Sequence, residues 1–142
     1  MSDLGTCEKC AGQFRYQIIH NGFSDTAYAY CDRCGCTAII SGWSPRPADA
    51  PFKVHQSISA DVEPFLKPCS CGGHFRAGAA PRCPECNSAL SADAATSYIE
   101  ANAAGTAKGW RWQRDWAGVY CIVVDGRRMD DPWRPELLPS DG

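Results

Sequence analysis

Eight of the ten cysteines in this 142-residue chain stand in four close pairs, and this spacing limits the possible folds more than any other feature. The pairs are Cys7 with Cys10, Cys31 with Cys34, Cys69 with Cys71, and Cys83 with Cys86. A tight turn of this length lets both sulfurs bind one metal ion at about 2.3 Å, while backbone N–H groups of the turn face the thiolates. The pairs therefore predict metal ions that form part of the fold.

We assign the four pairs to two sites by their nearness along the chain. The first predicted site contains Cys7, Cys10, Cys31 and Cys34, and the second contains Cys69, Cys71, Cys83 and Cys86. We call each pair of cysteines with the turn that carries it a knuckle. The Cys69–Cys71 knuckle is one residue shorter than the other three. The main alternative at the second site is that His74 replaces one sulfur. We expect two Zn²⁺ ions. Iron is the competing metal, because four thiolates in a tetrahedron also suit a mononuclear iron centre.

Two cysteines lie outside these pairs. Cys36 follows the second pair closely, so it could exchange with a ligand, but packing beneath the metal site is the simpler interpretation. Cys121 stands within the apolar run 119–124, where a free cysteine behaves as a small hydrophobic residue. We expect neither thiol to be catalytic.

The first part of the chain predicts short strands. Residues 14–18 and 26–30 alternate as half-buried strands do, and the Asn-Gly turn at 21–22 predicts that they pair as a hairpin. Residues 37–40 supply a third strand, and three prolines within 44–51 interrupt regular structure.

The second part predicts one helix and more strands. Residues 91–102 form the helix, with Ser91 as its N-cap. Strands over 110–116, 119–124 and 127–129 would make a three-stranded antiparallel meander rich in tryptophan. The expected fold is thus a small, metal-stabilised α+β protein that is mostly β.

We divide the chain into three segments. Residues 1–43 form the first metal-binding unit, residues 44–61 a proline-rich linker with an ambiguous stretch, and residues 62–142 the second unit. Both cysteine clusters resemble zinc ribbons, the rubredoxin-like hairpin modules. The resemblance covers about residues 7–40 and 69–87, and it implies four-cysteine metal binding on β-hairpins. It does not imply one activity, because ribbons occur with many functions.

The sequence shows no motif that we can connect to catalysis. It lacks the phosphate-binding, nucleophile-elbow and zinc-protease motifs, and a metal with four cysteine ligands has no open position for water. The amino terminus lacks the basic and apolar regions of a signal peptide. Cysteines that bind a metal as thiolates, and do not form disulfides, suit a reducing compartment. We therefore expect a cytoplasmic protein that is not an enzyme, with neither a membrane partner nor a small-molecule substrate.

Residues 108–128 are the stretch with functional promise, because basic side chains alternate there with Trp110, Trp112, Trp116 and Tyr120. Such a strip can form a hydrophobic core, bind a protein, or stack on nucleic-acid bases. We expect a protein-interaction or adaptor module. The alternatives are a nucleic-acid-associated factor that uses residues 108–128, and an iron or thiol redox protein.

Overall fold

The computed structural model describes residues 3–21, 25–54, 57–91 and 120–139. The predicted helix over 91–102 and the predicted strand over 110–116 fall almost wholly outside these residues, as does most of the basic strip 108–128. The described part is mostly β. It includes two short 3-10 helices, η1 (Ala60–Phe65) and η3 (Pro135–Leu137).

Two β-hairpins turn at cysteine knuckles. Strands β1 (Asp3–Thr6) and β2 (Gln13–His20) pair antiparallel on either side of the Cys7 knuckle. Strands β3 (Thr26–Cys31) and β4 (Thr37–Ser41) do the same around the next knuckle. The strands expected over 14–18, 26–30 and 37–40 are therefore confirmed, with slightly wider bounds.

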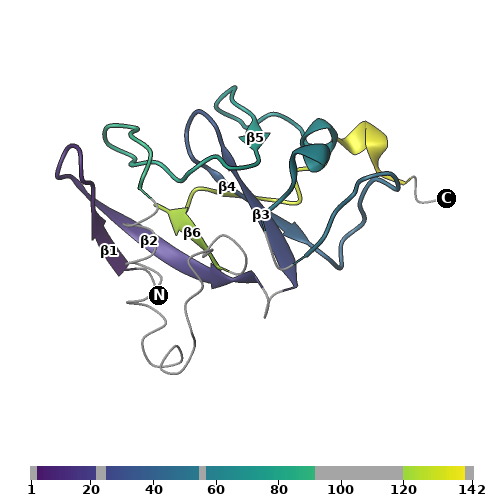
Figure 1. The fold of residues 1–142 in the computed structure, drawn as a ribbon, viewed down its shortest axis with the longest axis horizontal. Coiled ribbons are helices and arrows are strands. Elements are labelled where there is room, and N and C mark those ends of the chain that lie inside the picture. Colours follow the sequence, from purple (N-terminus) through teal and green to yellow (C-terminus); the bar gives the residue numbers. More distant parts are fainter. Residues whose placement is uncertain (1–2, 22–24, 55–56, 92–119, 140–142) are drawn as a thin grey trace.

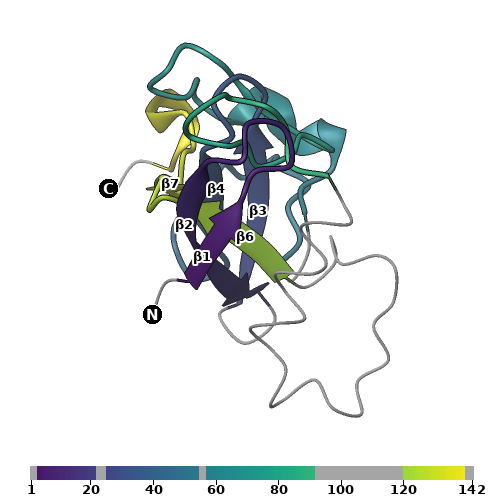
Figure 2. The same ribbon diagram turned by 90° about the vertical axis from the view of Figure 1, so that its left-hand side faces the viewer.

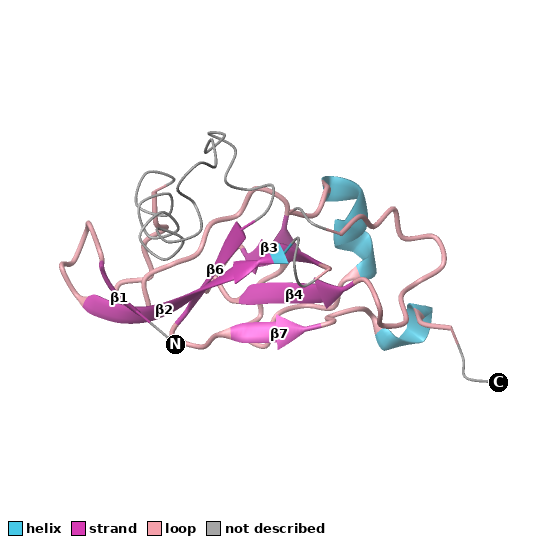
Figure 3. Ribbon diagram, turned by 90° about the horizontal axis from the view of Figure 1, so that it is seen from below, coloured by secondary structure: helices cyan, strands magenta, loops and turns pink. Residues whose placement is uncertain are grey.

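The strands form two sheets (Figure 1). The first has the order β1-β2-β6, in which β6 (Tyr120–Val124) pairs antiparallel with β2. The second has the order β5-β3-β4-β7, in which the short β5 (Phe75–Arg76) lies beside β3. Strand β7 (Arg128–Asp130) runs parallel to β4, as Figure 3 shows, and the two are neighbours in Figure 2.

The burial of each strand follows its sequence pattern. In β2, Phe14 and Tyr16 are buried while Gln13, Arg15 and Gln17 are exposed, as expected for a strand with one face on the core. Strand β3 is buried at every position, which suits its central place between β4 and β5.

The two sheets are joined through the backbone of β6. Ile122 pairs with β2, and its N–H also donates to the hydroxyl of Tyr30 at 2.8 Å. Its carbonyl accepts from the hydroxyl of Thr37 at 2.9 Å. All three residues are buried. Side chains of the second sheet therefore form hydrogen bonds with the backbone N–H and carbonyl of an edge strand of the first. In an exposed edge strand, water would bind these groups.

Two predicted strand pairings are wrong. The strands at 14–18 and 26–30 do not form a hairpin, because β2 pairs with β1 and β6 while β3 pairs with β4 and β5. In the predicted meander, β6 and β7 lie in different sheets although Asp125 and Gly126 do form the turn between them. The cysteine knuckles act as the hairpin turns in place of the Asn-Gly sequence.

The proline-rich segment packs against the second sheet. Phe52 and Ile58 are buried in the same core as Trp133, and the N–H of Ile58 donates to the carbonyl of Tyr28 at 2.9 Å. The proposed division at residues 43 and 61 stays a prediction, although both sheets combine strands from before and after this segment. In the described part of the chain, no helix has the length and apolar character that a membrane crossing needs.

Candidate metal centres

The eight paired cysteines gather into two groups of four. Group A contains Cys7, Cys10, Cys83 and Cys86, and group B contains Cys31, Cys34, Cys69 and Cys71. Within each group, the sulfur atoms all lie within 4.8 Å of one another. The predicted division by nearness in sequence is therefore wrong, because each group takes one pair from the first part of the chain and one from the second.

The sulfur spacing fits a tetrahedral metal ion. In group A, Sγ of Cys7 is 3.6 Å from that of Cys86, and Cys10 is 3.8 Å from Cys83. In group B, Sγ of Cys31 is 3.4 Å from that of Cys71, and Cys34 is 3.6 Å from Cys69. Two sulfurs on one tetrahedral ion at about 2.3 Å stand about 3.8 Å apart, whereas a disulfide needs about 2.05 Å. Both groups are able to hold a metal ion.

Three of the knuckles share one backbone geometry. In each, the N–H of the first cysteine donates to the carbonyl five residues later, and the N–H four residues later donates back to that cysteine's carbonyl. The residue at this fourth position has a positive φ: Ala11 at 61°, Gly35 at 74° and Asn87 at 61°. Such a φ suits glycine or asparagine and strains alanine.

The fourth knuckle is the same turn with one residue removed. The N–H of Cys69 donates to the carbonyl of Gly73, and that of Gly72 donates back to Cys69. Gly72 carries the positive φ, at 94°. A Cβ at Gly73 would stand 2.7 Å from Sγ of Cys31, so the two glycines allow both the shorter turn and its close approach to the facing cysteine.

Backbone amides face the sulfurs in all four knuckles. The N–H groups two residues after Cys7, Cys31, Cys71 and Cys83 donate to those sulfurs at 3.3 to 3.4 Å. Gly12 and Cys36 donate in the same way to Cys10 and Cys34, both at 3.4 Å. Hydrogen bonds of this kind stabilise thiolates and hold them in position for a metal ion.

The ionisation of group A is uneven. Hydrogen bonds from the hydroxyl and N–H of Ser88 lower the pKa of Cys86 to about 6. The N–H of Gly12 also favours the thiolate of Cys10, but burial and the sulfurs of the other three cysteines outweigh it and raise that pKa to about 12. Four neighbouring thiolates therefore require a cation, which is what a bound metal ion supplies.

The thiols of group B also differ in how readily they ionise. Burial opposes ionisation of Cys71, but the N–H of Gly73 and the neighbouring thiols lower its pKa to about 7. Burial raises the pKa of Cys31 and of Cys34, where neighbouring sulfurs add to the effect at Cys34. In each group one thiol, Cys86 or Cys71, has a lowered pKa and ionises first. Its negative charge then disfavours ionisation of the neighbouring thiols.

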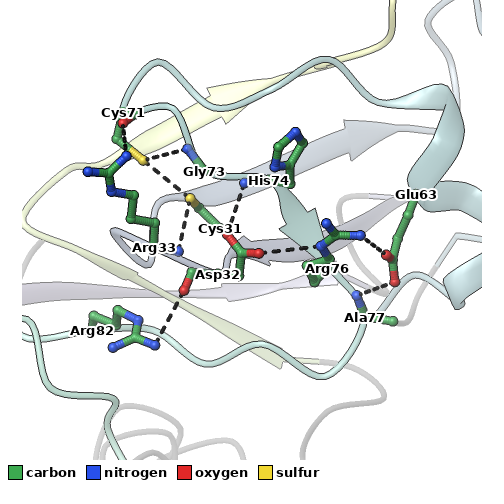
Figure 4. A network of polar contacts seen from close by, with 10 residues as sticks. All are labelled: Cys31, Asp32, Arg33, Glu63, Cys71, Gly73, His74, Arg76, Ala77 and Arg82. Atoms are coloured by element: carbon green, nitrogen blue, oxygen red, sulfur yellow. Dashed lines mark hydrogen bonds and ion pairs between the residues drawn. The ribbon is translucent and has the colours of Figure 1, made fainter.

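A polar network supports group B from outside (Figure 4). Asp32 exchanges backbone and side-chain hydrogen bonds with the backbone of His74, and its carboxylate contacts Arg76 at 3.3 Å. Arg76 also pairs with Glu63 of η1 at 3.1 Å. The N–H of His74, and then the charge of Arg76, lower the pKa of Asp32. This network joins the two knuckles of group B to each other and to η1.

The knuckles that carry the two groups also contact each other through residues other than cysteine. The guanidinium of Arg82, just before the Cys83 knuckle, donates to the carbonyls of Asn87 at 2.7 Å and Asp32 at 3.3 Å. The side-chain amide of Asn87 donates to the carbonyl of Arg33 at 2.9 Å. A knuckle of group A is thus hydrogen-bonded to a knuckle of group B.

Comparison with known protein families gives a match over most of the described amino-terminal part. A family described as a domain of unknown function, DUF8255, matches residues 4–92. The chain belongs to the DUF8255 family. No curated protein and no solved structure matches it. The DUF8255 match includes all eight cysteines of groups A and B, and it ends before β6 and β7, which complete the two sheets.

The other predicted candidates lie outside the sulfur groups of this DUF8255 protein. His74 is exposed, and group B has four sulfurs without it. Cys36 is buried beside Cys69, and burial with the nearby sulfurs raises its pKa to about 12. Cys121 is fully buried against Tyr28 and Tyr30, and burial raises its pKa to about 12. Both thiols have the surroundings of packing residues.

Sequence reasoning missed the contact between the groups. The available signal is Asn87. Asparagine tolerates a positive φ, and its side-chain amide can donate a hydrogen bond. The equivalent Ala11 and Gly35 also have a positive φ but carry no side-chain donor. The correct pairing of knuckles had a weaker signal: residues on both sides of the Cys7 and Cys31 knuckles are strand-forming, which favours a hairpin at each knuckle.

Proposed function

We propose that this DUF8255 protein is a zinc-stabilised, non-catalytic protein-interaction module of the cytoplasm. The observation that carries the proposal is the composition of groups A and B, each of which consists of four cysteine sulfurs. Zinc with four thiolate ligands has no open position at which to activate water, so its role is structural. The backbone N–H groups that face the sulfurs support the same role.

The proposal also assigns a zinc-ribbon fold to each group. Each group, with the hairpins that carry it, is a rubredoxin-like zinc ribbon whose two knuckles come from distant parts of the chain. The metal in group A joins Cys10 to Cys83, which are 73 residues apart, and the metal in group B joins Cys34 to Cys69, which are 35 apart. Closing such loops costs conformational entropy, and metal binding offsets that cost.

A role in binding is favoured over one in catalysis. The two thiols outside groups A and B are buried and have raised pKa values, and a nucleophilic cysteine needs the opposite. Two filled zinc sites take the formal charge from −2 to −6, because each group of four thiolates with one zinc contributes −2. A negative protein is poorly suited to a nucleic-acid backbone, which favours a protein partner.

Elemental and native mass spectrometry of the purified chain test the metal assignment. We expect two zinc ions per chain, one ion in Cys10→Ser, and still two in Cys36→Ser, the matched control that removes a thiol outside the groups. Two iron ions would move the protein to the redox alternative.

Capture with the zinc-loaded chain tests the role. The tagged chain is incubated with nuclease-treated cytosolic extract at low and moderate salt, and retained proteins are cross-linked and identified. We expect a stoichiometric protein that is lost from Cys34→Ser, which disables group B, and kept by Cys36→Ser. Retention of nucleic acid that weakens steeply with salt would replace this proposal with the nucleic-acid alternative.

A further inference from the structure

One surface of the second sheet combines an exposed aromatic side chain with two cations. The surface lies at the end of the β3–β4 hairpin away from the Cys31 knuckle, where β4 ends at Ser41. An open hollow of about 460 Å³ is lined there by Trp43, Arg46, Phe52 and Lys53, together with Asp25, Gly42 and Val54. We call the first four residues the Trp43 surface.

Trp43 is exposed yet held in position. The residue is 82% exposed, the largest exposed fraction among the large hydrophobic residues that the structure describes. Its indole N–H donates to the carboxylate of Asp25 at 3.3 Å, and its backbone N–H donates to the hydroxyl of Ser41 at 3.1 Å. The hydrogen bond to Asp25 favours one orientation of the indole, which lowers the conformational entropy lost on binding a partner.

The cations beside Trp43 are also held by the fold. The guanidinium of Arg46 lies 5.3 Å from the ring centre of Phe52, and Phe52 packs edge-on against the buried Trp133. Pro45 and Pro47 flank Arg46 and restrict the backbone of its loop. Lys53 is exposed on the same hollow. The position of Arg46 is therefore largely set before binding.

These features fit a peptide better than nucleic acid. Tryptophan and arginine are the residues most enriched where partner proteins bind tightly. Arg46 and Lys53 outnumber Asp25 among the residues that line the hollow, so its charge favours a negatively charged partner. The whole protein is negative, which disfavours a polyanion with a charge at every nucleotide.

We propose that the Trp43 surface binds an acidic peptide segment of a partner protein, with an apolar side chain of that segment against Trp43 and a carboxylate near Arg46 and Lys53. The proposal rests on the proposed function and names its binding surface. Zinc in group B would hold one end of the β3–β4 hairpin while the other end presents the surface.

Peptide display on the zinc-loaded full chain tests this inference. A library of random twelve-residue peptides is selected on the immobilised protein, and the dissociation constants of the selected peptides are measured by fluorescence anisotropy. We expect peptides with a net negative charge and an aromatic or aliphatic residue. Trp43→Ala and the double variant Arg46→Glu, Lys53→Glu should each weaken binding by at least about tenfold.

Two variants on the other sheet serve as matched controls. Leu4 is 65% exposed on β1 and Arg15 is exposed on β2, so Leu4→Ala and Arg15→Glu make comparable changes away from the hollow. Both should change the dissociation constant by less than about twofold. All variants should keep two metal ions and the unfolding temperature of the parent, which separates lost binding from lost folding.

Several outcomes would overturn the Trp43 surface. Selected peptides that bind Trp43→Ala as well as the parent, or that lack acidic residues, would place binding elsewhere and leave the interaction role itself standing. Failure to select any peptide would also count against the surface, and the capture experiment then decides the wider role separately. Trp43-dependent binding of a twelve-residue thymidine oligonucleotide that exceeds peptide binding would replace the peptide with nucleic acid.

Discussion

The side-chain amide of Asn87 donates to the backbone carbonyl of Arg33 at 2.9 Å, and this bond joins the two groups of cysteines. Asn87 belongs to the knuckle of Cys83 and Cys86, and Arg33 lies between Cys31 and Cys34. Arg82 adds a second connection to Asp32. Ordering of one knuckle by its metal therefore helps to order a knuckle of the other group.

We predict that zinc binding at the two groups is positively coupled. Cys86→Ser, which disables group A, should weaken zinc binding at group B by about fivefold, the effect of about 1 kcal/mol of lost hydrogen bonding. The affinity is measured by competition with a chromophoric chelator. In the Asn87→Gly background, which keeps the positive φ but removes the amide, Cys86→Ser should have a smaller effect. Equal effects in the two backgrounds would show that Asn87 does not carry the coupling.

Equivalent positions in two knuckles should respond oppositely to substitution. At Gly35, φ is 74° and an added Cβ would stand 2.5 Å from the backbone nitrogen of Arg82, so Gly35→Ala should lower the free energy of unfolding by more than about 2 kcal/mol. Ala11 already has a φ of 61°, so Ala11→Gly should raise that free energy by about 1 kcal/mol. Denaturant unfolding of the metal-loaded proteins measures both. A stabilised Gly35→Ala variant would contradict the knuckle geometry.

The link between the sheets should have a measurable free energy. Tyr30→Phe leaves the buried N–H of Ile122 without the hydroxyl that accepts from it, and should lower the free energy of unfolding by about 1 to 3 kcal/mol. Thr37→Val removes the donor to the carbonyl of Ile122 and should also be destabilising. Because both act on one residue, the double variant should cost less than the sum of the two. Strictly additive costs would argue that the two bonds act independently.

Metal binding should release protons and weaken as the pH falls. At pH 7, Cys10 with a pKa of about 12, and Cys31 and Cys34 with raised pKa values, hold protons that a metal must displace. Their thiolates form more readily as pH rises, so affinity should increase from pH 6 to pH 8. Calorimetry in buffers of different ionisation enthalpy counts the protons, and we expect at least about three per chain. Proton-free binding would mean that these thiols are not ligands.

The sequence predicted which cysteines gather in groups and most of the described strands, because both depend on local patterns. Two cysteines two residues apart need only one turn, and the alternation around Phe14 and Tyr16 follows the pleat of a single strand. The partners of these elements depend on long-range packing, which spacing does not encode. Cys10 meets Cys83 because β6 and the core around Phe14 bring distant segments together, not because they are neighbours in sequence.

The remaining errors have the same physical origin. The Asn-Gly sequence at 21–22 predicted a hairpin turn, but Asn21 is fully buried and accepts a hydrogen bond from Thr26 at 2.7 Å. The cysteine knuckles compete as turns, since each already closes a loop with two backbone hydrogen bonds. Strands β2 and β3 therefore each take a hairpin partner across a knuckle and do not pair with each other.

The division of the eight cysteines into groups A and B is the central structural claim, and cadmium NMR tests it most directly. The protein is loaded with ¹¹³Cd, and a ¹H–¹¹³Cd correlation spectrum connects each metal to the β protons of its own cysteines. We predict two cadmium signals, one correlated with Cys7, Cys10, Cys83 and Cys86 and the other with Cys31, Cys34, Cys69 and Cys71. A single cadmium correlated with both Cys10 and Cys34 would contradict the account.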